Sequence, residues 1–290
     1  MTILNIGSIN WDRLYVVDHF PGPGETLAAK SASVGLGGKG LNQSVAIQRA
    51  GGRVRHVGAI GEADAAMRAA VEDLGLETSG IVGIPGSLTG SALIVVERGG
   101  ENQIILDPGA NARIPAEHCR EQIVRLEAGD RVLLQNETNV LAEGAALARG
   151  QGVGVVLAAA PFDAALIWPV LPDIDLLAVN EIEFAQLREA GGELPNHLSI
   201  LVTYGARGAS LITPSETINV PAIRANPVDT TGAGDTTLGC FLARLDAGEP
   251  ADLALRYAMA AAALQVQAPG AATAIPHESE VLALLDQNAH

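Results

Sequence analysis

The chain has 290 residues, 48% of them hydrophobic and 18% charged, and it carries a formal net charge of −15. This length and hydrophobic content are enough for one large α/β domain, or for such a domain with a small appendage. No run of Lys or Arg occurs in the sequence, which argues against a nucleic-acid partner.

The cysteines, the histidines and the apolar stretches predict the cellular compartment and the absence of a zinc site. Cys119 and Cys240 are the only cysteines, so a disulfide framework is excluded and a reducing, cytoplasmic location is expected. The six histidines have no metal-ligand spacing, so no tightly held zinc is expected. The chain starts directly with a strand-like run, which predicts no signal peptide. The longest apolar stretch, Ala258 to Leu264, is too short to span a membrane.

Short apolar runs alternate with helical patterns along the chain. Strands are predicted at Ile3–Ile9, Val54–Ile60, Arg131–Gln135, Val153–Ala159, Asp175–Val179, Ser199–Thr203 and Ala209–Thr213. Helices are predicted at Asn42–Ala50, Ala63–Leu74, Pro115–Leu126, Val140–Arg149, Glu181–Glu189, Ala233–Asp246, Ala251–Val266 and Glu278–Gln287, with Gly51 and Gly191 at helix C-termini. Because several strands are apolar on both faces, we predict an α/β fold with a doubly wound, mainly parallel sheet flanked by helices, as a single domain over residues 1–290.

Two segments depart from this alternation. Residues 12–34 carry Pro21 and Pro23 among polar and β-branched residues, and residues 87–107 contain two apolar runs around Gly99 and Gly100. The second segment reads as a hairpin with these glycines in its turn. No helix separates its strands, so we predict a small β-sheet lid built from about 12–34 and 87–107.

The most specific motif is DTTGAGD at residues 229–235, where helical spacing begins around Ala233. Gly232 and Gly234 leave the backbone N–H groups of this helix start uncovered, which makes an anion site. A carboxylate beside it, Asp235, can take the proton of a hydroxyl while the amides hold phosphoryl oxygens. The alternative is an ordinary helix start with acidic first-turn residues.

Two further segments can bind a polar ligand. The glycine-rich residues 35–42 match neither the position of a dinucleotide motif nor the sequence of a P-loop, and we interpret them as a loop that brings backbone amides and Lys39 to a ligand, rather than as a flexible connector. Asn10 and Asp12 leave the first strand on one face and can bind vicinal hydroxyls, or they form a turn or N-cap pair.

The segments that follow two predicted strands can contact a nucleotide. Asn180 and Glu183 follow a strand and open a helix, so they either cap it or contribute to a water-mediated magnesium–phosphate site. The segment from Thr203 to Gly208 links two strands as a plain hairpin, or its small residues let a nucleotide lie against the backbone.

These motifs, in this order, resemble the ribokinase-like carbohydrate kinases, also called the pfkB family, and most closely the ribokinase branch. The resemblance covers nearly the whole chain and rests on GSINWD at 7–12, PGET at 23–26, GGKGLNQ at 37–43, GANA at 109–112, NEIE at 180–183 and DTTGAGD at 229–235. It implies an ATP-dependent kinase that transfers the γ-phosphoryl group to a hydroxyl, expected to be the primary one, of ribose or a similar small sugar. It also implies Mg²⁺, a K⁺ ion, and a homodimer formed through the lid.

The resemblance assigns roles residue by residue. It implies Asp235 as general base and Gly232, Ala233 and Gly234 as the anion hole. The implied sugar-binding set is Asn10, Asp12, Gly38, Lys39, Asn42 and Glu137. Asn180 and Glu183 match positions near the phosphates and Mg²⁺, and Thr203, Gly205 and Gly208 match the nucleotide loop. Asp229, Thr231, Gln265, Ala268 and Gly270 match the monovalent-cation positions.

Several residues depart from the family pattern. They are Trp11, Leu41, the pair Ala158-Ala159 where the family often has Asn-Pro, and Ala274 where a hydroxyl often binds the cation. These departures leave the catalytic base Asp235 unchanged. They affect which sugar is bound and whether a cation is required.

The alternatives are a nucleoside kinase on the same fold, with Trp11 and lid residues as a wall for the nucleobase, and a sugar-binding relative without catalysis. A dinucleotide-dependent oxidoreductase rests only on the glycine pattern, which is misplaced for that role.

Overall fold

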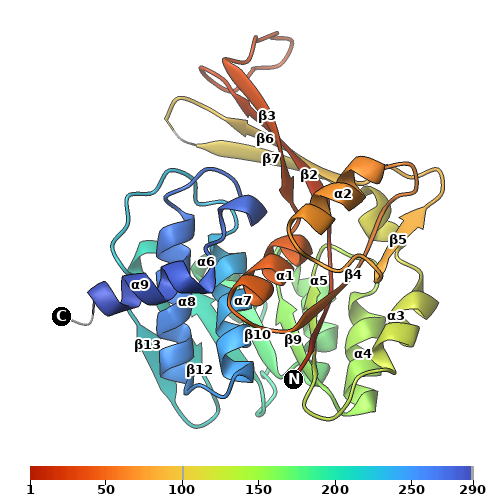
Figure 1. Cartoon of the computed structure of the whole chain (residues 1–290), viewed down its shortest axis with the longest axis vertical. Coiled ribbons are helices and arrows are strands. Elements are labelled where there is room, and N and C mark those ends of the chain that lie inside the picture. Colours follow the sequence, from red (N-terminus) through yellow and green to blue (C-terminus); the bar gives the residue numbers. More distant parts are fainter. Residues whose placement is uncertain (100, 289–290) are drawn as a thin grey trace.

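A computed structural model describes residues 1–99 and 101–288, and it shows a large sheet covered by helices and a separate small sheet (Figure 1). Gly100, expected in the hairpin turn, lies outside the described residues. The strands of the large sheet are β1 (Ile3–Ile6), β4 (Val54–Gly61), β5 (Ile81–Ile84), β8 (Arg131–Gln135), β9 (Gly154–Ala158), β10 (Leu176–Asn180), β11 (Ser199–Thr203), β12 (Ala209–Ile212) and β13 (Thr217–Val220).

The large sheet has the strand order β13-β12-β11-β10-β9-β8-β1-β4-β5. All neighbours from β11 to β5 pair in parallel, and only β12 and β13 pair antiparallel at one edge. Parallel strands buried on both faces need apolar residues on both faces, as the sequence shows. The predicted doubly wound, mainly parallel sheet is therefore confirmed.

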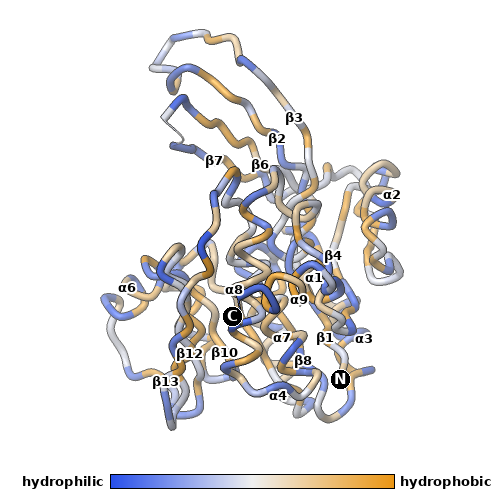
Figure 2. Tube along the Cα trace, turned by 60° about the vertical axis from the view of Figure 1, so that its left-hand side comes forward, coloured by the Kyte–Doolittle hydropathy of each residue, from blue (hydrophilic) through white to orange (hydrophobic). Residues whose placement is uncertain are grey.

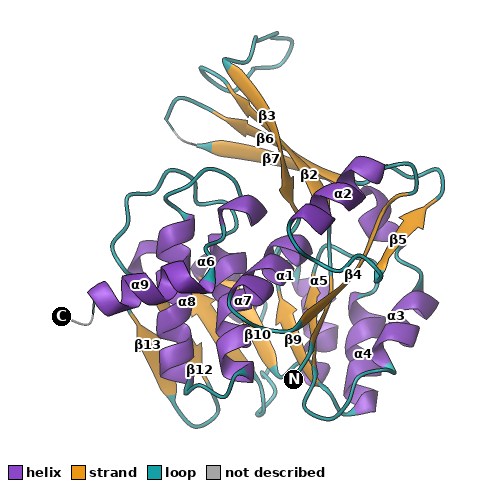
Figure 3. Ribbon diagram, viewed as in Figure 1, coloured by secondary structure: helices purple, strands orange, loops and turns teal. Residues whose placement is uncertain are grey.

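Helices cover both faces of this sheet (Figure 3). The helices are α1 (Lys39–Arg49), α2 (Ala65–Asp73), α3 (Ala116–Ile123), α4 (Leu141–Gln151), α5 (Ala164–Ile167), α6 (Glu181–Glu189), α7 (Ala233–Asp246), α8 (Ala251–Gln265) and α9 (Glu278–Gln287). One buried cluster takes residues from α1, α2, α7, α8 and α9, and the other takes residues from α3 to α6. Gly51 and Gly191 follow helix ends with φ of +84° and +72°, as predicted.

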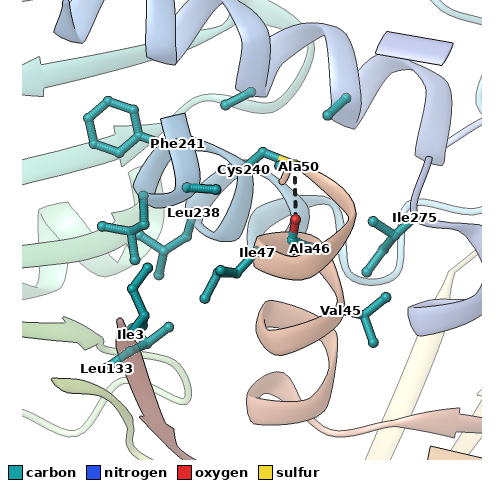
Figure 4. Close-up of a cluster of buried hydrophobic side chains, with 14 of the residues drawn as sticks. Ile3, Val45, Ala46, Ile47, Ala50, Leu133, Leu238, Cys240, Phe241 and Ile275 are labelled. Atoms are coloured by element: carbon teal, nitrogen blue, oxygen red, sulfur yellow. Dashed lines mark hydrogen bonds between the residues drawn. The ribbon is translucent and has the colours of Figure 1, made fainter. Parts of the chain in front are cut away.

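Helices α1 and α7 pack very closely (Figure 4). A Cβ on Gly239 would lie 2.5 Å from Cβ of Ala46 and 2.8 Å from the carbonyl oxygen of Gln43, so only glycine allows this approach. The thiol of Cys240 lies next to it and donates to the carbonyl of Ala46 at 3.8 Å. The close contact holds the N-terminal turns of α1 and α7 side by side, where their side chains meet.

The small sheet has the order β3-β2-β6-β7, with β2 (Asn10–Val16), β3 (Ser31–Gly37), β6 (Gly90–Val96) and β7 (Asn102–Asp107). It stands clear of the main body, as the tube in Figure 2 shows. β2 pairs antiparallel with β3 and parallel with β6, and β6 pairs antiparallel with β7. The small sheet that the sequence predicts is therefore present.

Most predicted bounds shift by one to three residues, and two differences bear on the site. The first strand ends at Ile6 rather than Ile9, because residues 7–9 carry the chain from the large sheet into β2, so Asn10 and Asp12 belong to the small sheet. The glycine-rich segment is not a single loop, since its first residues complete β3. A Cβ on Gly37 would lie 2.0 Å from a carboxylate oxygen of Asp12, so glycine is needed where this side chain crosses β3. Within the described residues, no helix is long and apolar enough to cross a bilayer.

Candidate active site

The N-terminus of α7 presents backbone donors at the carboxyl edge of the sheet. Gly232 precedes the helix with a φ of +80°, a conformation that favours glycine, and no described side chain caps the helix. The dipole of this 14-residue helix places its positive end here. The arrangement can hold a phosphoryl group, as the motif at 229–235 predicts.

Asp235, in the first turn of α7, is held by two side-chain amides of α1. Asn42 Nδ2 donates to its Oδ2 at 2.9 Å, and Gln43 Nε2 donates to its Oδ1 at 2.8 Å. Burial raises the pKa of Asp235, while the charge of Lys39 and these two donors act in the opposite direction. Each oxygen keeps capacity to accept a further proton or hydrogen bond, which is what a base needs.

The hydrogen bonds of Gln43 extend into a fully buried polar chain. Gln135 Nε2 donates to Gln43 Oε1 at 2.8 Å and to Asn5 Oδ1 at 2.7 Å. Asn5 Nδ2 in turn donates to the carbonyl of Gly40 at 2.7 Å and to Ser44 Oγ at 2.9 Å. The chain fixes the rotamer of Gln43, and through it the orientation of Asp235.

The predicted sugar residues gather around Lys39. Glu137 lies 3.7 Å from its ammonium, accepts from its backbone N–H at 3.2 Å, and also accepts from the hydroxyl of Ser8. Burial lowers the pKa of Lys39, but the carboxylates of Asp235, Glu137 and Glu183 outweigh it, so the pKa is raised and Lys39 stays charged.

Asn10 is anchored from a segment far away in the sequence. Its Oδ1 accepts from Asn111 Nδ2 at 2.7 Å, and Asn111 Oδ1 accepts from the backbone of Ile9 at 3.0 Å. Gly38 lies against the same connection, because a Cβ there would be 3.0 Å from the Asn10 nitrogen. The structure thus brings Asn10 and Gly38 together.

Asp12 lies on the same face of β2 as Asn10, and other carboxylates of the site act on its charge. Burial, followed by the charge of Glu137, raises the pKa of Asp12 to about 7, while Lys39 acts in the opposite direction. In the folded protein Asp12 therefore holds a proton between about pH 4 and pH 7 that the unfolded chain releases. This makes the free energy of unfolding fall as pH rises through that window.

Asp12→Asn is expected to stabilise the free protein more at pH 8 than at pH 5, by about 1–2 kcal/mol, because the amide removes the buried charge. Thermal unfolding of the variant and the wild type at both pH values measures this. The matched control is Asp73→Asn, which changes an exposed carboxylate at the end of α2. An equal shift of the Asp12 variant at both pH values contradicts the prediction.

Two adjoining cavities meet at the start of α7. The larger, of about 590 Å³, is bounded by the predicted nucleotide residues Gly205 and Gly208 and by an apolar wall that includes Met259 and Val266. The smaller, of about 240 Å³, contains Lys39 and Asp235. Both cavities share Thr203, Thr230, Ala233 and Gly234 as lining residues. A nucleotide in the larger cavity can therefore direct its terminal phosphate toward Asp235.

Asn180 and Glu183 border the smaller cavity and also cap α6. Asn180 Oδ1 accepts from the Glu183 nitrogen at 2.9 Å, and Glu183 Oε2 accepts from the Asn180 nitrogen at 2.8 Å. The structure thus shows the cap, and the magnesium–phosphate site stays a prediction for two residues that border this cavity. The second oxygen of Glu183 fits the water-mediated contact that Mg²⁺ favours.

The residues predicted to bind a monovalent cation form hydrogen bonds with one another in this structure. Gln265 Nε2 donates to the carbonyls of Thr231 at 2.6 Å and Gly270 at 3.3 Å. The carboxylate of Asp229 accepts from the backbone nitrogens of the same two residues, both at 2.9 Å. Ala268 donates its backbone N–H to the carbonyl of Gln265. Donors of the protein therefore already occupy acceptors that a cation would use.

Some site residues had no predicted role. Gln43 and Asn111 stood within motifs of the sequence, but their partners lie 192 and 101 residues away, so only the fold reveals them.

Trp11 points to the other face of β2 from Asn10 and Asp12, and its Nε1 donates to Asp64 at 2.9 Å. Trp11 therefore does not contribute to the wall for a nucleoside base that the sequence suggested for it and for lid residues.

Fold and site together define an open α/β phosphotransferase, with an anion site and a carboxylate between two cavities at the carboxyl edge of the sheet. A model of the pfkB carbohydrate kinase family matches residues 2–278, and the chain belongs to this family. The prediction of a carbohydrate kinase from the sequence motifs is thereby confirmed.

Individual relatives agree with this assignment. The chain is 32% identical to a ribokinase of Haemophilus influenzae, with 98% of both chains covered. It is similar to the structure of Arabidopsis thaliana ribokinase complexed with ribose and ATP, with 28% identity, a TM-score of 0.81 and 98% of both chains covered. A nucleoside kinase of Burkholderia thailandensis has a TM-score of 0.88, with 99% of this chain and 97% of that chain covered, but only 20% identity, so it shows the fold alone.

Proposed function

We propose that this chain phosphorylates ribose, or a closely similar small sugar, on a primary hydroxyl with ATP as donor. The observation that carries the proposal is the carboxylate of Asp235, oriented by Asn42 and Gln43 at the junction of the two cavities. The similarity to the ribokinases of Haemophilus influenzae and Arabidopsis thaliana supports the choice of sugar.

In this mechanism the side chains around Lys39 hold the sugar with its hydroxyl next to Asp235. Asp235 accepts the proton of this hydroxyl. At the same time the hydroxyl oxygen of the sugar attacks the γ-phosphoryl group, in line with the leaving ADP. The amides of Gly232, Ala233 and Gly234 stabilise the charge on the phosphoryl oxygens. Asn180 and Glu183 would hold the Mg²⁺ that neutralises the nucleotide phosphates when bound.

The test is ADP release from the purified protein with ATP and Mg²⁺ against a panel of pentoses, hexoses and nucleosides. Turnover on ribose or a close pentose is expected. Turnover on nucleosides alone would keep the base and overturn the sugar. Calorimetric binding of ribose without turnover would instead indicate a sugar-binding relative that has lost catalysis.

We also propose that the chain forms a homodimer through the small sheet, which serves as the lid. Strands β7 and β3 are the two edge strands of this sheet. Ile104 and Ile105 of β7 are 52% and 66% exposed, and Val34 of β3 is 60% exposed. An apolar edge of this kind is stable when a second copy covers it. Sedimentation analysis should give a dimer for the wild type and a monomer for Ile104→Asp, and a monomeric wild type contradicts the proposal.

A cytoplasmic location completes the proposal. Cys119 and Cys240 are buried free thiols, which suits a reducing compartment. Fractionation of cells that produce the chain tests this, and recovery outside the cytoplasmic fraction overturns it.

A further inference from the structure

The side chain of Gln265 lies in the middle of the residues predicted to bind a monovalent cation. Gln265 is the last residue of α8 and is fully buried. Its Nε2 lies 2.6 Å from the carbonyl oxygen of Thr231 and 3.3 Å from that of Gly270. Both partners only accept hydrogen bonds, so the amide must turn its NH₂ group toward them.

We propose that the amide of Gln265 replaces the monovalent cation, so that this kinase works without K⁺. A cation bound by these carbonyls would have to displace the amide nitrogen, because both compete for the same oxygen lone pairs. Ala274 agrees with the proposal, since it lacks the hydroxyl that often binds the cation in the family.

The proposal gives Gln265 a positioning role for the anion hole. Thr231, whose carbonyl the amide holds, directly precedes Gly232 at the start of α7. Asp229 ties the same two segments, accepting from the nitrogens of Thr231 and Gly270 at 2.9 Å each. The backbone nitrogens of Val228 and Asp229 also donate to the carbonyl of Val266. The loop before the anion hole is thus joined to the end of α8 by direct hydrogen bonds.

The oxygen of the same amide allows the opposite arrangement, in which a cation is bound. Gln265 Oε1 is buried and has no hydrogen-bond partner among the described residues. Rotating the amide by half a turn would bring this oxygen to the carbonyls of Thr231 and Gly270, where it could only stay with a cation between the oxygens. The two states differ in their response to K⁺, so an experiment can separate them.

The experiment compares KCl with tetramethylammonium chloride at equal ionic strength, using the full chain. The first readout is the melting temperature, and the second is kcat/KM for ribose with ATP and Mg²⁺. The second readout rests on the proposed function, whereas the first does not. If no sugar is turned over, the proposed function fails while the melting temperature still tests Gln265.

For the wild type we expect the same melting temperature and the same kcat/KM within about twofold in both salts. Gln265→Glu has the same shape but places a carboxylate against two carbonyl oxygens. It should lose about tenfold or more in kcat/KM without K⁺, and K⁺ should restore activity and raise the melting temperature. Gln265→Met removes the donors without adding a cation ligand, so it should lose activity in both salts.

Gln151→Glu, at the exposed end of α4, is the matched control and should show none of these effects. A wild type whose melting temperature rises with K⁺, or whose kcat/KM rises with K⁺ where a sugar is turned over, would overturn the proposal, since a cation would then bind despite the Gln265 amide. Unchanged kcat/KM in both Gln265 variants without K⁺ would also overturn it. If Gln265→Glu does not fold, the wild type and Gln265→Met still decide.

Discussion

Asp235→Asn is expected to lower kcat for the sugar by about 10²- to 10⁴-fold, because the amide cannot accept the hydroxyl proton. Asparagine has nearly the same shape, so the contact with Asn42 or Gln43 can be kept in part and the site stays formed. Steady-state kinetics gives the loss in kcat. Calorimetry with ribose should give an affinity close to that of the wild type.

The control for this substitution is again Asp73→Asn, which removes a carboxylate far from the cavities and should leave kcat unchanged. Two results would remove Asp235 from the proposed role. One is a variant with nearly full kcat. The other is a variant whose kcat falls only because ribose no longer binds.

Gly40→Ala is expected to lower the free energy of unfolding by about 1–3 kcal/mol and kcat/KM for the sugar by up to about 10²-fold. A Cβ on Gly40 would lie 2.5 Å from the backbone nitrogen of Ser8 and 2.6 Å from Cα of Gly7. These are backbone atoms and cannot turn aside, so α1 or the connection after β1 must shift. Lys39 and Asn42 would then move away from Glu137 and Asp235. Urea unfolding and kinetics with varied ribose measure the two effects.

Gly150→Ala is the matched control, because it lies near the exposed end of α4 and its Cβ would meet no atom within 4 Å. It should raise the free energy of unfolding by about 0.5–1 kcal/mol and leave kinetics unchanged. If Gly40→Ala keeps kcat/KM within about twofold of the wild type, close backbone contact is not what positions the sugar residues.

Local sequence signals predicted most of the large sheet and its helices. Arg131–Gln135, Ser199–Thr203 and the helix Glu181–Glu189 occur with the predicted bounds. The helix could be located because Asn180 and Glu183 form a capping box, which is a strictly local signal. The short strands β5 and β13 were missed. They lie at the two edges of the large sheet and are mostly not buried, so they lack the apolar character that marked the equally short β1 and β12.

The missed parts of the site depend on contacts between distant segments. Asn10 looked like the end of the first strand, because an apolar run does not show where a chain passes from one sheet to another. The motif around Gln43 was visible, but its hydrogen bond to Asp235 depends on the packing of α1 against α7. The same holds for Gln265, whose residue type fits a helix end as well as it fits a cation site.

All four strands of the small sheet join the main body at the same end. β2 starts at Asn10, which pairs with Gly37 at the end of β3 and with Gly90 at the start of β6, while Asp107 ends β7 beside Ser91. The sheet is therefore a cantilever, with Asn10 at its fixed end and Val16 toward its free end. A swing about the fixed end would sweep the free end through a wide arc and hardly displace Asn10. Substitutions toward the free end, at Val16 for example, would then change the motion of the small sheet and leave the position of Asn10 nearly unchanged.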